Sequence, residues 1–573
     1  MCRMSIVKIA FLGTFLLLAP PCWGQVATVS GVAEAIERAD VFVGELDEAG
    51  APGCALGVLD LDTRSWVYQG AYGLADIEHD IANTPDLVFG VASVTKQFTA
   101  AAVALAAHQG YFSLGDDIRA YVPEIPDYGA PITIRDLIHH TNGLRDIGRL
   151  ILLTGKMRRY LGQDSRVGLL ARQRATNFPA GTDYRYGNSD YLLLAELIER
   201  TSGQAFADYV EENIFRPLGM KDSYFGTATR GKDGRALPYS YTQEKWRGEE
   251  WLPEAPGDWG PAGLMTRLDD FAKWTANLFA DESRLAGGAE LTRMLRANGR
   301  LRDGSPVPYG FGLRLLRYRG LKTIGHSGSG YGYKAHTVIF PDRALGVFGF
   351  CNNGIYAQPV VMGLADIFLD LASDGQADPK EPAITLSPAQ LKDFTGVYRE
   401  NELRLPMIVE SRGNGLLVTG DASPSIFEPV AMSRFRNKQN LIIEFEGRSE
   451  AGARFFIQKQ GRKYGSGRFE RVERLSLAKR RIAEYAGDYY SPEVDATYRF
   501  SVEGGKLMAR ILEKEPRSIS PFTFEPLIED EFVAIPDRLA IRFTRERGGA
   551  PTGLVLTYQF GWITDVEFYR VQP

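Results

Sequence analysis

The pattern of apolar and polar positions divides residues 32–371 into strand-like ends and a helix-rich middle. Apolar positions at helical spacing predict a first helix over residues 32–48, and two short apolar runs, 54–61 and 66–69, predict strands around a polar turn. Helical patterns follow from residue 93 to about 109 and over residues 190–201, 205–215, 268–279 and 360–371, while strand-like text returns within 322–354. Strands at both ends with helices between them predict an α/β domain with one sheet assembled from the two ends.

The pattern changes after residue 373. Residues 374–386 are polar and proline-containing and are interpreted as a linker, and short strands and turns dominate beyond it. An internal repeat is present: LKDFTGVY at 391–398 matches IAEYAGDY at 482–489, and FERV at 469–472 matches FYRV at 568–571. The repeat predicts two small all-β barrels, over residues 387–475 and 476–573.

The first 24 residues have the composition of a secretory signal peptide. Arg3 and Lys8 precede the apolar stretch 9–19, and small residues follow it, with cleavage expected after Gly24. The apolar stretch is too short to span a bilayer, and no later stretch is long and apolar enough to do so. The expected product is a secreted or periplasmic protein without an integral membrane segment, whose first domain covers residues 25–373.

Composition narrows the possible partners. The 573 residues carry a formal net charge of -5 and the pI is near 5.9, so nothing favours a nucleic-acid or anionic-membrane partner. Basic residues gather between Arg145 and Arg174, where a solvated surface is the default interpretation. Cys54 and Cys351 remain after the signal, each at the end of an expected strand, and buried free thiols are the favoured state.

No metal or other cofactor is expected. The neighbouring His139 and His140 point apart on a helix, and no carboxylate or cysteine at ligand spacing completes a site around them.

Ser93 is the first candidate catalytic residue. It stands between an apolar run at 87–91 and the alanine-rich helix, with Lys96 on the same face one turn later. A helix N-terminus and apolar surroundings both favour a neutral amine, which can take the proton of a hydroxyl. The Ser-x-x-Lys pattern alone is weak, because it also occurs at Ser5–Lys8 and Ser476–Lys479.

Two further motifs follow in order: Tyr186-x-Asn188 and His326-x-Gly328, the latter at the end of an expected strand. Together the three motifs resemble those of the serine β-lactamase and penicillin-binding-protein superfamily, in the branch of class C β-lactamases, D,D-carboxypeptidases and D-aminopeptidases. Residues 134–144, 178–181 and 260–264 resemble the same family, so that the likeness covers residues 32–371. The likeness implies a β-lactamase-like α/β fold, with an antiparallel sheet flanked by helices. The two trailing β units resemble the lipocalin-like barrels of D-aminopeptidases.

The resemblance implies a role for each motif residue. Ser93 attacks a carbonyl and is acylated, while Lys96 and Tyr186 share the proton transfers, and which of the two is the base stays open. Asn188 binds the substrate amide and the lysine, and the third motif, from His326 through Gly328 to Ser329, lines the cleft. The backbone N–H groups of Ser93 and Ser329 form the oxyanion hole. In the related fold the first and last strands of the sheet are neighbours, so Cys54 and Cys351 are expected to lie close together, and pairing between them is left open.

One departure bears on the substrate. In β-lactamases of this superfamily the third motif usually begins with lysine, a cation for the substrate carboxylate, whereas His326 is largely neutral at pH 7. This favours D-amino-acid amides, peptides bound by their amino end, or esters, unless an arginine from the basic segment at 145–174 restores the cation. The expected function is therefore a D-aminopeptidase or D,D-peptidase working through an acyl-enzyme. Alternatives are an esterase, a β-lactamase, or a non-catalytic protein that binds peptidoglycan fragments. The oligomeric state is left open.

Overall fold

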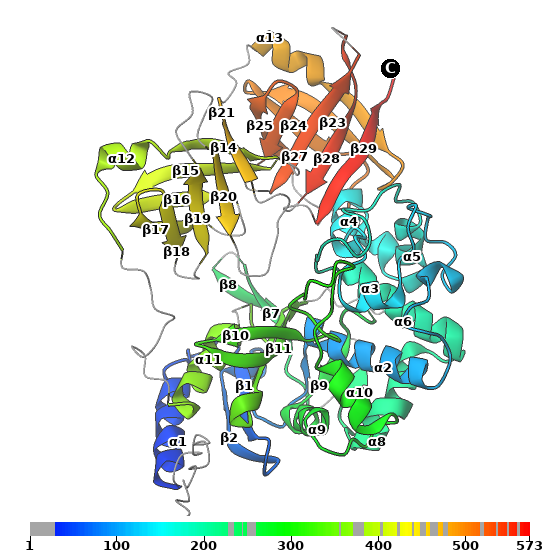
Figure 1. The fold of residues 1–573 in the computed structure, drawn as a ribbon, viewed down its shortest axis with the longest axis vertical. Coiled ribbons are helices and arrows are strands. Elements are labelled where there is room, and N and C mark those ends of the chain that lie inside the picture. Colours follow the sequence, from blue (N-terminus) through cyan, green and yellow to red (C-terminus); the bar gives the residue numbers. More distant parts are fainter. Residues whose placement is uncertain are drawn as a thin grey trace, which may run out of the picture.

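A computed structural model shows an N-terminal domain (residues 29–370) and two barrels (Figure 1). It describes residues 29–226, 234–242, 244–248, 259–354, 357–370, 383–401, 405–420, 424–437, 441–446, 454–458, 468–473, 479–515, 521–534, 537–546, 549–558 and 562–572. The signal-peptide prediction for residues 1–24 lies outside these residues. No helix within the described residues is long and apolar enough to cross a membrane.

A six-stranded antiparallel sheet with the order β10-β11-β12-β13-β1-β2 forms the centre of the described N-terminal domain. The strands are β1 (Cys54–Asp60), β2 (Ser65–Tyr72), β10 (Arg314–Tyr318), β11 (Leu321–Gly330), β12 (Tyr333–Phe340) and β13 (Leu345–Cys351). β1 pairs with β13, so the predicted sheet made from both ends of the domain is confirmed. The sequence interpretation missed β10, which pairs with the first half of β11 and leaves the second half free on that side.

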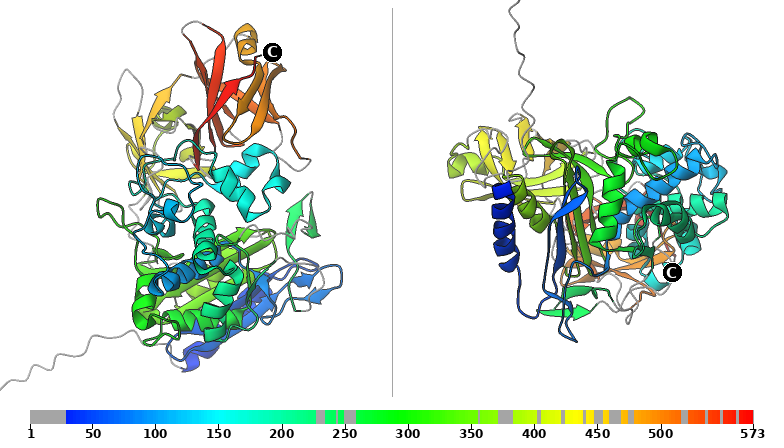
Figure 2. Two further views of the ribbon diagram at one scale, coloured as in Figure 1. Left: turned by 90° about the vertical axis from the view of Figure 1, so that its right-hand side faces the viewer. Right: turned by 90° about the horizontal axis from the view of Figure 1, so that it is seen from below.

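Helices cover both faces of the sheet, as the two views of Figure 2 show. α1 (Val29–Gly44) and α11 (Ala357–Phe368) lie on one face, and a larger helical lobe built around α2 (Lys96–His108) lies on the other. α2 is alanine-rich and buried along nearly its whole length. A helix that is apolar all round is a core helix, and this one carries Lys96 into the interior.

The remaining elements of this domain are shorter. The helices and helical turns are η1 (Ala92–Thr95), η2 (Ile118–Ala120), α3 (Ile134–Ile138), α4 (Ile147–Thr154), η3 (Met157–Tyr160), α5 (Gln163–Leu170), α6 (Asn188–Ser202), α7 (Phe206–Val210), η4 (Glu211–Phe215), α8 (Arg216–Leu218), α9 (Leu268–Leu278), α10 (Gly288–Leu295) and η5 (Pro341–Arg343). The small strands are β3 (Leu74–Asp76), β4 (Ile81–Ala82), β5 (Phe89–Gly90), β6 (Tyr224–Phe225), β7 (Tyr239–Thr242), β8 (Lys245–Gly248) and β9 (Leu264–Thr266).

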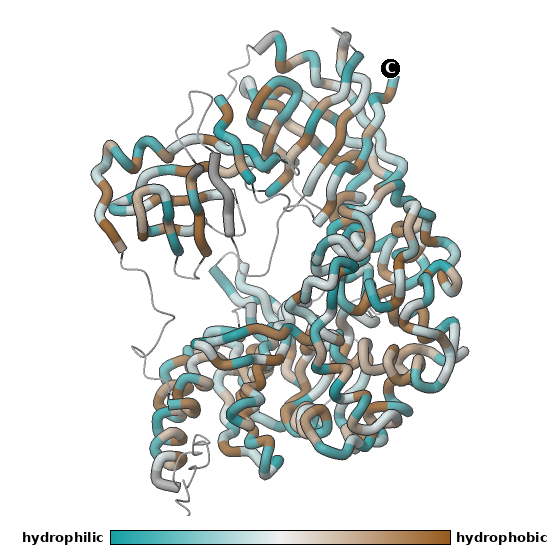
Figure 3. Tube along the Cα trace, in the orientation of Figure 1, coloured by the Kyte–Doolittle hydropathy of each residue, from teal (hydrophilic) through white to brown (hydrophobic). Residues whose placement is uncertain are grey.

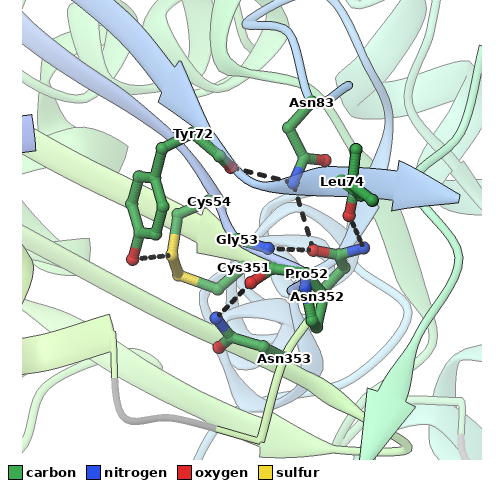
Figure 4. Close-up of a disulfide and its surroundings, with 9 residues drawn as sticks. All are labelled: Pro52, Gly53, Cys54, Tyr72, Leu74, Asn83, Cys351, Asn352 and Asn353. Carbon is green, nitrogen blue, oxygen red and sulfur yellow. Dashed lines mark hydrogen bonds between the residues drawn. A yellow bond between two sulfur atoms is a disulfide. The ribbon is translucent and has the colours of Figure 1, made fainter. Parts of the chain in front are cut away.

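Cys54 and Cys351 form a disulfide, so the preference for free thiols was wrong. They face each other as cross-strand partners in the β1–β13 ladder, where the first and last strands of the domain meet. Around them, Asn352 accepts a hydrogen bond from the backbone N–H of Gly53 and from Asn83 (Figure 4). This junction therefore joins β1 to β13 both through the disulfide and through a buried network of amide hydrogen bonds.

Each barrel is a closed ring of eight antiparallel strands within the described residues. The first, which follows α12 (Pro388–Lys392), contains β14 (Gly396–Glu400), β15 (Pro406–Arg412), β16 (Gly415–Thr419), β17 (Ser425–Ala431), β18 (Arg434–Asn437), β19 (Ile442–Glu446), β20 (Arg454–Gln458) and β21 (Arg468–Val472). The second, which follows α13 (Lys479–Ile482) and η6 (Ala483–Tyr485), contains β22 (Gly487–Ser491), β23 (Ala496–Glu503), β24 (Lys506–Ile511), β25 (Phe522–Ile528), β26 (Glu531–Ala534), β27 (Leu539–Arg545), β28 (Pro551–Tyr558) and β29 (Ile563–Arg570). Apolar and polar residues alternate along these strands (Figure 3), as expected where one face lines the core of a barrel.

The internal repeat has the same local structure in both copies. Tyr398 donates to the carbonyl of Phe394, and Tyr489 donates to the carbonyl of Tyr485, four residues earlier in each case. Gly396 and Gly487 occupy the same place before each tyrosine with φ values of 152° and 144°. The repeated sequence therefore encodes one barrel-opening turn used twice.

Candidate active site

Ser93 lies in the helical turn η1, between β5 and α2, so it stands just before the long helix rather than in its first turn. Strand β11 passes close to this turn. A Cβ on Gly328 would lie 2.1 Å from the carbonyl oxygen of Val91, so only glycine allows this approach. This contact gives a physical reason for the glycine of the His-x-Gly motif.

Lys96 is fully buried directly behind Ser93. Its Nζ donates hydrogen bonds to Ser93 Oγ at 3.2 Å, Asn188 Oδ1 at 2.8 Å and the Pro261 carbonyl at 2.9 Å. Burial lowers the pKa of Lys96 to about 7, although the nearby carboxylates of Asp146 and Asp190 act in the opposite direction. Near neutral pH a large share of this amine is therefore unprotonated and able to accept a proton.

Tyr186 stands on the other side of the amine, with Lys96 Nζ 4.8 Å from its ring centroid. Its hydroxyl is buried and makes no well-aligned hydrogen bond within the described residues, although Ser93 lies near enough to lower its pKa. The larger effect is burial, which raises the pKa of Tyr186 and keeps the phenol protonated. The hydroxyl is thus available to a group that enters the site.

Asn188 is the first residue of α6. Its backbone N–H donates to Asp146 Oδ2 at 2.7 Å, and Asp146 is also the N-cap of α4. One carboxylate therefore joins the start of two helices and holds the amide that accepts from Lys96.

His326 is buried on β11 and is neutral. Its Nδ1 donates to the Ser327 carbonyl at 2.7 Å, which leaves Nε2 to accept from the hydroxyl of Tyr309 at 2.9 Å. Burial is the main cause that holds the pKa of His326 well below its usual range, and the charges of Arg314 and Lys96 add to it. His326 is consequently a polar side chain whose two ring nitrogens are both hydrogen-bonded, and it is not a cation.

Arg314 is a cation of this site that the sequence analysis missed. It lies on β10 beside Gly325, with its guanidinium carbon 5.4 Å from the ring centroid of Tyr186. Its Nε is buried without a hydrogen bond, and Arg314 makes no ion pair within the described residues. Arg314 lies outside the basic segment at 145–174, on β10, a strand that was not predicted. The signal available was a basic residue on the hairpin that leads into His326.

The adjacent histidines, His139 and His140, have different neighbours. His140 Nδ1 bonds the buried carboxylate of Asp190, and its ring centroid lies 4.5 Å from that of Tyr186. His139 packs against Phe311 instead, with centroids 5.2 Å apart. No cluster of metal-ligating side chains occurs among the residues with described positions. His140 therefore packs against the ring of Tyr186 and is held in place by Asp190.

The second barrel reaches this site. The Trp562 ring, just before β29, lies 6.2 Å from the ring of Tyr186, and Arg149 of α4 stacks 5.0 Å from the same indole. The backbone carbonyl of Trp562 accepts from Asn177 at 3.1 Å. A residue more than 300 positions from Tyr186 in the sequence thus forms part of its surroundings, which periodicity within either segment does not reveal.

The chain is similar in sequence and fold to several known proteins. The D-aminopeptidase of Gluconobacter oxydans (strain 621H) is 27% identical over 465 residues, covering 79% of this chain and 82% of that protein. The D-aminopeptidase of Brucella anthropi is 27% identical over 525 residues, covering 88% and 93%. Among solved structures, the octameric penicillin-binding protein homologue from Pyrococcus abyssi has a similar fold, with a TM-score of 0.51 and 19% identity over 84% of this chain and 97% of that one.

The family assignment follows from a direct match. The family model described as Beta-lactamase matches residues 38–369, more than half of the chain. The resemblance to this superfamily and to its D-aminopeptidase branch, predicted from three short motifs, is confirmed. The chain belongs to the Beta-lactamase family.

Proposed function

We propose that this chain is a serine hydrolase of the D-aminopeptidase type that works through an acyl-enzyme on Ser93. The observation that carries the proposal is the fully buried Lys96 amine, 3.2 Å from the Ser93 hydroxyl, with a pKa lowered to about 7. A serine hydroxyl is a weak nucleophile until a base takes its proton, and this amine is placed and partly deprotonated to do so.

The chemistry runs in two halves. Ser93 Oγ attacks the carbonyl carbon of the substrate while its proton passes to Lys96, directly or through the Tyr186 hydroxyl, and then to the departing group. The backbone N–H groups of Ser93 and Ser329 hold the oxyanion, and Asn188 binds the substrate amide. A water molecule then attacks the acyl carbon by the reverse proton route and frees Ser93.

The substrate proposed first is a D-amino-acid amide or a short peptide with an N-terminal D-residue. The two named relatives are D-aminopeptidases, and the neutral His326 supplies no charge for a carboxylate. The signal-like N-terminus supports a secreted or periplasmic location for this activity.

A second candidate, a D,D-peptidase acting at a free C-terminus, is favoured by Arg314. This guanidinium lies at the site without an ion-pair partner among the described residues, and a substrate carboxylate is the natural partner of such a group. The preference inferred from His326 alone is therefore weakened, because the cation is present on a neighbouring strand.

Steady-state turnover on matched substrates separates the two candidates. D-alanine amide and D-alanyl-D-alanine amide test the first, and the free acid of N-acetyl-D-alanyl-D-alanine tests the second, with a p-nitrophenyl ester and a chromogenic β-lactam as further arms. Higher kcat/KM on the free-amine amides supports the D-aminopeptidase, and higher kcat/KM on the free acid supports the D,D-peptidase. Folded enzyme that turns over none of these and is not labelled on Ser93 by a fluorophosphonate contradicts the hydrolase proposal.

A further inference from the structure

A buried ion pair between Arg145 and Glu493 lies where the second barrel meets the N-terminal domain. Glu493, in the turn between β22 and β23, is 1% exposed, and its Oε2 binds the Nη1 of Arg145, which is equally buried. The same carboxylate accepts the backbone N–H of Arg174 at 2.9 Å and that of Glu567 at 3.1 Å. Arg145 also donates to the Asp565 carbonyl, so it bonds the barrel at two places. The basic segment at 145–174, expected to be a solvated surface, is at this residue an interface core.

Arg145 is joined by its backbone to the residues that hold the catalytic amide. Its carbonyl accepts from Ser189 Oγ at 2.6 Å, and that hydroxyl accepts from the Ile147 N–H at 2.7 Å. Between them, Asp146 holds the backbone N–H of Asn188 at 2.7 Å. The segment from 145 to 147 is therefore fixed on one side by the barrel and on the other by the first residues of α6.

The barrel also contacts Asp146 directly. The carbonyl of Trp562 accepts the Asp146 N–H at 3.4 Å, and Asn177 ties that carbonyl and the backbone of Thr564 to the same corner. Two segments of the barrel, at Glu493 and at Trp562, thus meet the short stretch that ends in the Asn188 contact. Buried networks of this kind have few alternative arrangements, so moving one member moves its neighbours.

We propose that Glu493 of the second barrel is a positioning residue, acting through Arg145 and Asp146 on Asn188 and Lys96. The inference rests on the proposed function only in taking Ser93 and Lys96 as the reacting pair. Glu493 touches neither of them. Its effect is to hold the Asp146 carboxylate where it binds Asn188 and faces the Lys96 amine.

This role has a distinctive electrostatic consequence. Asp146 raises the pKa of Lys96 against the effect of burial. When Glu493 loses its charge, Arg145 becomes an uncompensated cation and the 145–147 segment relaxes, and both changes lower the pKa of Lys96. If the barrel only stabilised the fold, a folded Glu493 variant would keep the wild-type pKa of Lys96.

The test compares Glu493→Gln with Asp495→Asn in the full-length protein. Asp495 lies in the same turn and forms an ion pair with the half-exposed Arg159. Asp495→Asn therefore removes the same charge as Glu493→Gln but leaves the contacts that lead to Asp146 in place. Both are measured as pH profiles of kcat and kcat/KM on a neutral ester, with active sites counted by fluorophosphonate labelling and folding checked by circular dichroism. Labelling of the wild type on Ser93 verifies the proposed function separately.

The proposal predicts that Glu493→Gln lowers kcat by about tenfold per labelled site, the size of a typical coupling between contacting groups, with a small change in KM. The acid limb of its profile is expected to move to lower pH, while Asp495→Asn keeps the wild-type profile. Glu493→Asp, which keeps the charge but shortens the side chain, is measured beside it and is expected to shift the limb less; it decides the matter if Glu493→Gln does not fold. An unshifted acid limb in the folded Glu493 variant, or an equal shift in Asp495→Asn, overturns the proposal.

Discussion

The Nζ of Lys96 lies 3.2 Å from the Oγ of Ser93, inside a helix that is buried along nearly its whole length. A buried helix is an unusual place for a lysine, since a charged amine loses its hydration there. Three acceptors surround the amine, and no carboxylate of the described residues bonds it directly. The site thereby keeps a lysine whose neutral form is accessible near neutral pH.

The pH dependence of acylation follows from this burial. Because the pKa of Lys96 is lowered to about 7, the fraction of neutral amine increases as the pH rises through that value. On an uncharged ester, kcat/KM is therefore expected to increase with pH and to level off above an inflection near 7. A profile that falls through this range contradicts the role of the amine as the base.

A permanent cation at position 96 provides the matched control. Lys96→Arg is expected to lower kcat/KM by about 10²–10⁴-fold, the usual contribution of a general base, with no recovery at high pH. Stopped-flow measurements of acylation by the same ester compare the wild type with Lys96→Arg.

Arg314 is expected to decide between substrates with and without a carboxylate. Arg314→Gln removes the unpaired guanidinium, and a lost charged hydrogen bond costs roughly 1.5–3 kcal/mol, or about 10–150-fold in kcat/KM on a free-acid peptide. On the matching peptide amide the change is expected to be small. The ratio of the two kcat/KM values is the measurement, and an unchanged ratio rules out a carboxylate partner for Arg314.

The same substitution has a second effect that needs no peptide. Arg314 lowers the pKa of Lys96, so its removal is expected to move the acid limb of the ester profile to higher pH. Arg317, on the same strand, is exposed and bonded to the Gly320 carbonyl, so Arg317→Gln is the control that leaves this limb in place.

Trp562 is expected to limit the size of the acyl group. Its ring lies 6.2 Å from that of Tyr186, and Trp562→Ala removes that wall while the backbone bond to Asn177 remains. Relative kcat/KM for p-nitrophenyl esters of increasing chain length is expected to rise toward the longer esters by several-fold, since each added methylene contributes about 0.8 kcal/mol when it finds apolar surroundings. Trp562→Phe keeps a ring and should retain the wild-type order of kcat/KM among the esters. If all three proteins show the same relative kcat/KM values, Trp562 does not limit the size of the acyl group.

The disulfide is expected to contribute stability rather than activity. Cys54 and Cys351 lie in the core on the α1 and α11 face of the sheet, opposite the helical lobe that carries Ser93. The pair Cys54→Ala and Cys351→Ala is expected to lower stability by about 2–5 kcal/mol, seen as a lower Tm, with kcat/KM at 25 °C nearly unchanged. A large loss of turnover in the folded double variant contradicts this separation.

The parts of this account that the sequence predicted are those encoded locally. The alanine-rich helix after Ser93 and the repeated sequence that opens each barrel both depend on residues a few positions apart, and both are present. The three motifs lie together in the structure, and the sequence analysis associated them through the resemblance, because no periodicity contains this long-range association.

The parts that were missed depend on contacts between distant segments. Arg314 lies on a short strand with a half-exposed pattern that resembles a loop, and its importance comes from the ring of Tyr186. Arg145 reads as a surface residue in a basic stretch and is buried only because Glu493, 348 positions later, meets it. The cysteines pair because β1 and β13 are neighbours in the sheet, a property of the whole domain.

Intact-mass measurement after exposure to a fluorophosphonate tests the central claim most directly. The account predicts one adduct on the wild-type protein, mapped by peptide sequencing to Ser93, and none on a folded Ser93→Ala variant. An adduct that persists in Ser93→Ala, or a wild-type protein that is folded and remains unlabelled, would contradict the assignment of Ser93 as the nucleophile.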